Sequence, residues 1–234
     1  MTNPFTWRHY RGEIILLCVR WYLRYGLSYR DLEEMMTERG LALVHTTFYR
    51  WVQVYAPELD RRSRPHLKKT NDSWRVDETY VKVRGVWMFL YRAVDSTGQT
   101  LDFLLNETRS SRAAKRFFKR VLDRPNTDAP RVINVDKNRA YIGAIQDLIR
   151  DNLLPMTCKR RPSRYMNNII EQDHRFIKRR TRPGLGFASY PTAWRTIRGY
   201  ETIHMIRKGQ MEGAEKGDLK AQNAFIASLF GLAV

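Results

Sequence analysis

The sequence has little of what would build a disulfide framework, a zinc site or a membrane span. Only two cysteines occur among 234 residues, Cys18 and Cys158, which are too few for a disulfide framework and favour a reducing cytoplasm. The five histidines are scattered along the chain with no Cys-x-x-Cys nearby, so no zinc site is expected. No apolar run approaches the ~20 residues that span a bilayer. The N-terminal stretch MTNPFTWRHYRGE also lacks an apolar signal-peptide region.

Acidic residues are scarce relative to basic ones. The chain has 42 Lys and Arg against 24 Asp and Glu, a formal net charge of +18 and a sequence pI of about 10.2. Because 43% of the residues are hydrophobic and 12% aromatic, this is the composition of a folded protein and not of a disordered polycation. The positive charge favours a nucleic acid as partner, through its phosphates. A membrane surface explains the charge less well, and no small-molecule substrate is indicated.

Residues 10–55 carry the apolar spacing of three helices. Gly26 and Gly40 end the first two, and Ser28 is a suitable N-cap for the second, with Asp31 three residues later. Short helices, a turn and a third helix are typical of a helix-turn-helix, although an ordinary three-helix bundle has the same pattern. We expect this DNA-binding domain to span 1–57. Its third helix is expected to present the DNA-reading side chains Thr47, Tyr49, Arg50 and Gln53.

The pattern changes after a basic, proline-containing linker over 58–72. Three alternating segments joined by tight turns predict antiparallel strands over 74–83, 86–95 and 100–107. Helices are then expected over 110–124, 138–152, 163–181 and 190–208, and further strands over 130–136 and 153–159. This order predicts an α/β core with a mixed sheet over 73–209, preceded by the all-α domain and followed by a helical tail over 210–234.

Three carboxylates occupy positions that suit metal binding. Asp77 lies in the first strand, Asp136 at the carboxyl end of the fourth, and Glu171 on a late helix. Adjacent central strands bring the two aspartates together at the edge where α/β sheets place their chemistry. Three converging carboxylates are what a pair of Mg²⁺ (or Mn²⁺) ions needs in order to promote phosphodiester cleavage.

Glu171 lies in the most basic part of the chain. Counting about 100° per residue, it shares one helix face with Arg175, Lys178 and Arg182. The opposite face carries the apolar side chains of Met166, Ile169, Ile170, Phe176 and Ile177. We therefore predict that Glu171 binds metal while neighbouring cations bind the DNA phosphates that pass it, with Arg175, Lys178 and Arg179 as the candidates.

Each of these carboxylates also has a simpler interpretation. Glu171 is placed to pair with Arg175 one turn later, and Asp136 to cap the helix that it precedes. Asp77 is also consistent with a solvated strand residue, in which case Glu78 or Asp95 serves in its place. The large aromatic side chains are interpreted as core and not as base-stacking platforms: Trp51, Trp87, Phe89, Tyr91 and Trp194.

Several segments, in this order, resemble one known family. They are SYRDLEEMMTERG, TTFYRWVQVYAPEL, VDETYVKVRGVWMFLYRAVDSTGQTLDF, VINVDKNRAY, NNIIEQDHRFIKRR and RPGLGFASYPTAWRTIRGYE. Together they are similar to the DDE transposases of bacterial insertion sequences, specifically the insertion-sequence-six family. The resemblance covers nearly the whole chain and is weakest over the last two dozen residues.

The resemblance implies a ribonuclease-H-like catalytic core with Asp77, Asp136 and Glu171 as its acidic triad. Residues 137–170 separate the second and third acids, as in the family, and the family's basic residue seven positions after the glutamate is Lys178 here. It further implies a homodimer or higher homo-oligomer that acts on terminal inverted repeats and forms cointegrates. Such an enzyme works in the bacterial cytoplasm, associated with the nucleoid when bound to DNA.

Three functions compete on this evidence. The first is an Mg²⁺-dependent transposase in which an exposed 3′-hydroxyl attacks target DNA directly, with no covalent protein intermediate. The second is a helix-turn-helix repressor with a catalytically inert ribonuclease-H-like domain, which leaves the acidic triad unexplained. The third is a ribonuclease-H-like nuclease that cuts DNA without joining it. Action on two DNA ends favours at least a dimer.

Overall fold

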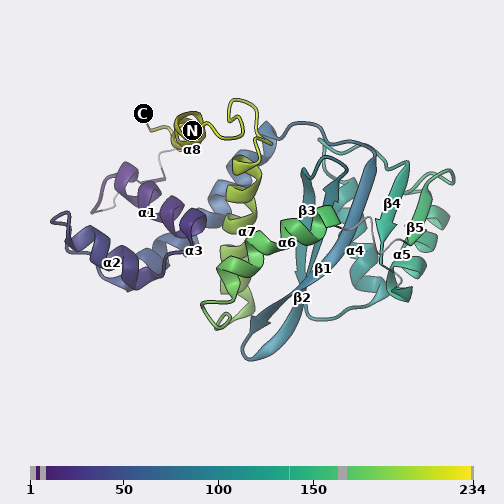
Figure 1. Cartoon of the computed structure of the whole chain (residues 1–234), viewed down its shortest axis with the longest axis horizontal. Coiled ribbons are helices and arrows are strands. Elements are labelled where there is room, and N and C mark those ends of the chain that lie inside the picture. Colours follow the sequence, from purple (N-terminus) through teal and green to yellow (C-terminus); the bar gives the residue numbers. More distant parts are fainter. Residues whose placement is uncertain (1–3, 6–8, 137, 163–167, 233–234) are drawn as a thin grey trace. The chain divides into compact units, whose positions relative to one another are not determined.

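The computed structural model describes residues 4–5, 9–136, 138–162 and 168–232 (Figure 1). Its elements group into two units. The sheet unit is Lys68–Thr181, and the helical unit consists of Met1–Leu67 together with Arg182–Val234. Residues 182–209, expected in the catalytic core, group in this division with the N-terminal helices, as does the expected tail over 210–234.

The sheet unit contains five strands in the order β3-β2-β1-β4-β5. Strands β1 (Ser73–Val83), β2 (Val86–Asp95) and β3 (Thr100–Asn106) form the predicted antiparallel meander. Strand β4 (Val132–Val135) runs parallel to β1, and β5 (Lys159–Pro162) runs parallel to β4. The predicted α/β class and mixed sheet are confirmed, with the strand order and directions of a ribonuclease-H-like fold.

Two tight turns hold the meander in register. Arg84 and Gly85, between β1 and β2, both have positive φ, 51° and 79°, as a two-residue hairpin turn requires. Between β2 and β3, the buried carboxylate of Asp95 accepts bonds from the backbone N–H groups of Thr97 and Gln99. Asp95 is thereby committed to the turn, which gives it a structural role in place of the catalytic one considered for it.

Helices cover both faces of the sheet. Helices α4 (Ser111–Leu122) and α5 (Arg139–Arg150) bury Phe117, Phe118 and Tyr141 against Trp74 and Val76 of β1 and their neighbours. Helix α6 (Asn168–Thr181) crosses β1 and β2 on the other face (Figure 1). Because side chains alternate along a strand, β1 presents successive residues to two different helical layers.

The last strand begins where the predicted one ends. A strand was expected over 153–159, but that segment forms turns, and β5 is Lys159–Pro162. The apolar residues of this segment suggested a strand, but Leu154 and Cys158 reach the core from an irregular segment, and Met156 is 88% exposed. Lysine and arginine are acceptable in β5 because it is an edge strand that pairs only with β4.

The helical unit contains α1 (Gly12–Tyr25), α2 (Tyr29–Thr37), α3 (His45–Ser63), η1 (Arg64–His66), α7 (Tyr190–Arg207) and α8 (Leu219–Leu229). The predicted N-cap of α2 is present as a reciprocal capping box between Ser28 and Asp31. The third helix has no side-chain cap and begins after Val44. Helices α1 and α2 pack on α3, which lies along α7.

Helix α3 runs through Pro57 instead of ending there, so the predicted linker over 58–72 begins inside a helix. A proline removes one backbone hydrogen bond, which burial of Ala56 and Leu59 offsets. The buried Asp60 also stabilises this part of the helix, since its carboxylate accepts hydrogen bonds from Arg64 and from Arg198 of α7 at 2.8 and 2.7 Å. Burial opposes its ionisation, but these two guanidinium groups outweigh that effect and lower the pKa of Asp60.

Candidate functional site

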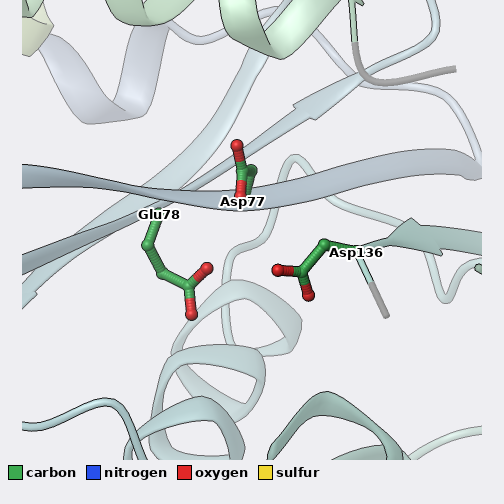
Figure 2. A group of neighbouring side chains, drawn as sticks. All are labelled: Asp77, Glu78 and Asp136. Carbon is green, nitrogen blue, oxygen red and sulfur yellow. The ribbon is translucent and has the colours of Figure 1, made fainter. Parts of the chain in front are cut away.

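Asp77 and Asp136 lie side by side because of strand register. Arg75 of β1 pairs with Asn134 of β4 in a parallel ladder, and each aspartate lies two residues further along its own strand direction. Asp136 directly follows the last residue of β4, at its carboxyl end. The predicted meeting of these two side chains at the edge of the sheet is therefore what the structure shows (Figure 2).

Glu78 joins the two aspartates. Figure 2 shows Asp77 and Glu78 leaving β1 on opposite sides, with Asp136 just beyond the end of β4. One ligand oxygen from each of the three lies within 4.8 Å of the others. The sequence offered Glu78 only as a substitute for Asp77. Because side chains alternate along a strand, Glu78 and Asp77 point to opposite faces of β1, and the sequence did not predict that both would reach the same site.

Arg109 connects two of these carboxylates. Its Nε and Nη2 donate to the two oxygens of Glu78 at 3.0 and 3.1 Å, and Nη2 also donates to Oδ2 of Asp136 at 2.6 Å. The Glu78 side chain is only 3% exposed, whereas Arg109 and Asp136 are about one-third exposed. The bidentate bond to Glu78 is the main cause of a raised pKa for Arg109. Arg109 could not be singled out from the sequence, since nothing in its neighbourhood sets it apart.

The environment of Asp77 disfavours its charged form. Burial raises the pKa of Asp77 to about 7, and the negative charges of Glu78 and Asp136 act in the same direction. Arg109 and a hydrogen bond from the backbone oppose the shift without cancelling it. A carboxylate cluster of this kind is stabilised by any additional positive charge placed among its oxygens.

Helix α6 brings Glu171 to the same side of the sheet as Asp77. His174, one turn after Glu171, is buried with Nδ1 3.8 Å from Oδ2 of Asp77. Burial lowers the pKa of His174 to about 3, and the charges of Arg92 and Lys178 add to that effect, so the ring is neutral. Glu171 itself is exposed, and within the described part of the chain it does not belong to the three-carboxylate group.

A buried ion pair fixes α6 on the sheet. Arg92 of β2, opposite Asp77 in the strand register, is fully buried and lies 2.5 Å from Asp173 of α6. The helical pattern assigned Asp173 and His174 no role, but both are buried beside the predicted apolar residues Ile170, Phe176 and Ile177. Met166, also assigned to that face, lies outside the described residues. Arg175 and Arg179 are exposed, and Lys178 is half-buried.

Comparison with known proteins agrees with this geometry. A family model described as a DDE domain matches residues 71–210. The Staphylococcus aureus transposase for the insertion sequence-like element IS431mec is 40% identical over 207 residues, covering 88% of this chain and 89% of the relative. The S. aureus transposase for insertion sequence element IS257 in transposon Tn4003 has the same identity and coverage.

This chain belongs to the insertion-sequence-six family of DDE transposases. Among solved structures, the HTLV-2 integrase catalytic core domain in complex with magnesium aligns with 18% identity and a TM-score of 0.39. That alignment covers 47% of the transposase and 68% of the integrase chain. In the described residues of the transposase, no helix has the length and apolar character to cross a membrane.

The donor set of the transposase suits a hard divalent cation. Asp77, Glu78 and Asp136 offer only oxygen, the ligand that Mg²⁺ and Mn²⁺ prefer, and their oxygens are close enough together to share an ion. The Arg109 guanidinium bonded to two of them shows that the cluster attracts positive charge.

The predicted DNA-reading residues of α3 do not all face outward. Tyr49 and Arg50 are exposed and Thr47 is half-buried. Gln53 is only 9% exposed, and its Nε2 donates to Oγ1 of Thr196 on α7 at 2.9 Å. Its assignment as a reading residue is therefore wrong, because the helix phase turns Gln53 toward α7.

The aromatic residues expected in the core separate into two groups. Tyr91 and Trp51 are buried, and Phe89 and Trp194 are partly so. Trp87 is 58% exposed, which corrects the prediction for it. The reason is that Trp87 lies near the tip of the β1–β2 hairpin, where its neighbours are the exposed Tyr80 and the Lys82 ammonium.

Proposed function

We propose that the transposase binds the terminal inverted repeats of an insertion sequence and catalyses metal-dependent cleavage and strand transfer that form cointegrates. The exposed 3′-hydroxyl of the element attacks a target phosphodiester directly. The observation that carries the proposal is the placement of Asp77, within β1, beside Asp136, at the carboxyl end of the parallel strand β4, in a chain of this family.

Asp77 and Asp136 are proposed to hold Mg²⁺ or Mn²⁺, with Glu171 as the third ligand and two ions in the site. When bound, such ions activate a hydroxyl nucleophile and stabilise the leaving oxygen of a phosphodiester. The position of His174 supports a role for Glu171, since it places the Glu171 turn of α6 next to Asp77. Lys178 lies on α6 two turns after Glu171, and we assign it to the phosphate at the reacting centre.

DNA phosphates are proposed to lie along the exposed face of α6, held by Arg175 and Arg179. Element ends are proposed to be read by Tyr49 and Arg50 on α3, with Thr47 at the margin of that surface. Because the reaction needs two element ends, we propose that the active species is a homodimer or a higher homo-oligomer on double-stranded DNA.

The direct test uses purified transposase, labelled element-end DNA, a target plasmid and Mg²⁺. Asp136→Asn removes the negative charge while retaining the size of the side chain. We expect it to abolish cleavage and strand transfer while leaving end binding in place. Asp128→Asn, at an exposed position outside the cluster, is the matched control and should keep activity.

Two outcomes would contradict the proposal in different ways. Strand transfer that survives Asp136→Asn would remove this aspartate from the chemistry. Specific binding to the ends without cleavage under any divalent metal would instead identify a repressor, and cut ends that are never joined would identify a nuclease.

A further inference from the structure

Arg109 occupies a position at the carboxylate cluster that the proposed chemistry does not use. Its Nη2 donates to Oδ2 of Asp136 at 2.6 Å and to Oε2 of Glu78 at 3.1 Å. A cation held by the carboxylate of Asp136 on its Glu78 side needs the lone pairs that this nitrogen already uses. The guanidinium and such an ion therefore compete for the same oxygen atoms.

Glu78 provides a separate anchor for the same guanidinium. Its carboxylate is almost completely buried and receives two parallel hydrogen bonds from Arg109, an arrangement that fixes the orientation of the planar group. Asp136 receives one bond from Arg109, on Oδ2, while its Oδ1 accepts from the backbone N–H of Asn138, and Asp136 is more exposed than Glu78. The bond to Asp136 can therefore break while the Glu78 side of the pair holds.

The backbone around Arg109 allows this movement. Arg109 lies in the short connection between β3, which ends at Asn106, and α4, which begins at Ser111. Residues 107–109 are exposed and belong to no helix or strand. The side chain can leave Asp136 without displacing any element that carries an acidic residue.

We propose that Arg109 is an internal counter-cation that closes the carboxylate cluster, and that a divalent ion displaces it from Asp136 while Glu78 retains it. Glu78 is then the residue that positions Arg109 and not a third member of the triad. The inference rests on the proposed function, because it assumes that Asp136 binds metal. It explains why an acidic residue next to Asp77 converges on the site from the opposite face of β1.

The test measures metal binding directly, in the absence of DNA. Mn²⁺ affinity of the full-length transposase is determined by titration calorimetry and by the electron paramagnetic resonance signal of free Mn²⁺. Arg109→Ala should bind Mn²⁺ about tenfold or more tightly than the unaltered protein, since ion binding no longer has to break a charge-assisted hydrogen bond. Metal-free Arg109→Ala should also melt at a lower temperature than the unaltered protein, because the buried Glu78 loses its bonds from Arg109. Mn²⁺ should then raise the melting temperature of Arg109→Ala by more than it raises that of the unaltered protein.

Matched variants separate this effect from general electrostatics and from misfolding. Arg112→Ala removes an exposed cation three residues away and should leave Mn²⁺ affinity within about twofold, because exposed charges are screened by solvent. If Arg109→Ala does not fold, Arg109→Gln keeps a donor for Glu78 but is neutral and too short to bridge both carboxylates. It should show the same gain in affinity.

Equal Mn²⁺ affinity in the Arg109 variants, the Arg112 variant and the unaltered protein would overturn the inference while leaving the metal site intact. Weaker Mn²⁺ binding in the Arg109 variants would also overturn it, since Arg109 would then support the ion instead of competing with it. If Asp136→Asn binds Mn²⁺ as well as the unaltered protein, or no form binds it, the proposed function fails together with the inference.

Discussion

Single side chains of α3 show how burial separates DNA reading from structure. Arg50 is exposed, whereas Gln53 is buried and bonded to Thr196. Arg50→Ala should weaken binding to element ends while changing the free energy of unfolding by no more than about 0.5 kcal/mol. Gln53→Ala should instead cost about 1–3 kcal/mol, because it leaves Thr196 without its buried partner. Fluorescence anisotropy with end DNA and urea unfolding distinguish the two, and an Arg50 variant that unfolds as easily as the Gln53 variant would contradict this assignment.

Some residues of the candidate site could be predicted from the sequence, and others could not. Asp77 and Asp136 could be predicted because a strand and a strand end can be recognised from local sequence. The parallel register of β1 and β4 then places the two side chains next to each other. Arg109 was not found, because its importance lies in contacts with residues 31 and 27 positions away. Gln53 was misplaced because an error of one residue in helix phase rotates a side chain by about 100°. Glu171 stays a prediction.

Among the elements, α6 depends on its buried ion pair with the sheet. Asp173→Ala removes the carboxylate that lies 2.5 Å from the fully buried Arg92, and we expect it to cost about 3–5 kcal/mol of unfolding free energy. Hydrogen exchange should also increase in α6, and strand transfer should fall with it because Glu171 and Lys178 lose their support. Chemical denaturation and exchange measured by mass spectrometry provide the two readouts.

The control for that prediction is an exposed pair on α5. Asp147 and Arg150 are bonded at 2.6 Å near the surface, and Asp147→Ala should cost no more than about 1 kcal/mol. Equal losses from Asp173→Ala and Asp147→Ala would mean that the Arg92–Asp173 pair does not hold the helix. Replacing Arg92 and Asp173 together by Met and Leu should recover much of the stability.

Helices α3 and α7 approach closely at Gly199. A Cβ added there would lie 2.6 Å from the Cβ of Ala56 and 2.8 Å from the Leu23 side chain. Gly199→Ala should therefore lower the free energy of unfolding by about 1–3 kcal/mol through overpacking. Gly184→Ala, with nothing within 4 Å of the added carbon, is the control and should be close to neutral. Thermal unfolding of the pair tests this, and a stabilised Gly199→Ala would show that the helices can separate at no cost.

Element boundaries were less predictable than the elements themselves. The three meander strands follow from alternation and turn residues, which act over short stretches of chain. Strand β5 and the extension of α3 past Pro57 do not, because each is decided by what it packs against. Pairing with β4 makes a strand of Lys159–Pro162, and the contacts of Asp60 with Arg198 help to continue a helix through a proline. Packing of this kind overrides local propensity.

For the whole molecule, a net charge of +18 predicts binding to DNA that depends strongly on salt. A protein with about six to ten phosphate contacts loses about 10³–10⁵ in affinity between ~50 and ~200 mM salt. Arg175→Ala and Arg179→Ala should each reduce the slope of log affinity against log salt by about 1, with little change in sequence preference. Arg150→Ala, an exposed cation on α5, should leave the slope unaltered, and a change as large as that of the α6 variants would argue against the proposed DNA path.

The proposed chemistry requires a divalent ion shared by carboxylates from two adjacent strands. Crystals of the transposase with element-end DNA and Mn²⁺, measured for anomalous scattering, test this most directly. We expect an anomalous peak within about 2.0–2.3 Å of carboxylate oxygens of both Asp77 and Asp136. Mn²⁺ bound elsewhere, with these two side chains coordinating no ion while DNA is in place, would contradict it.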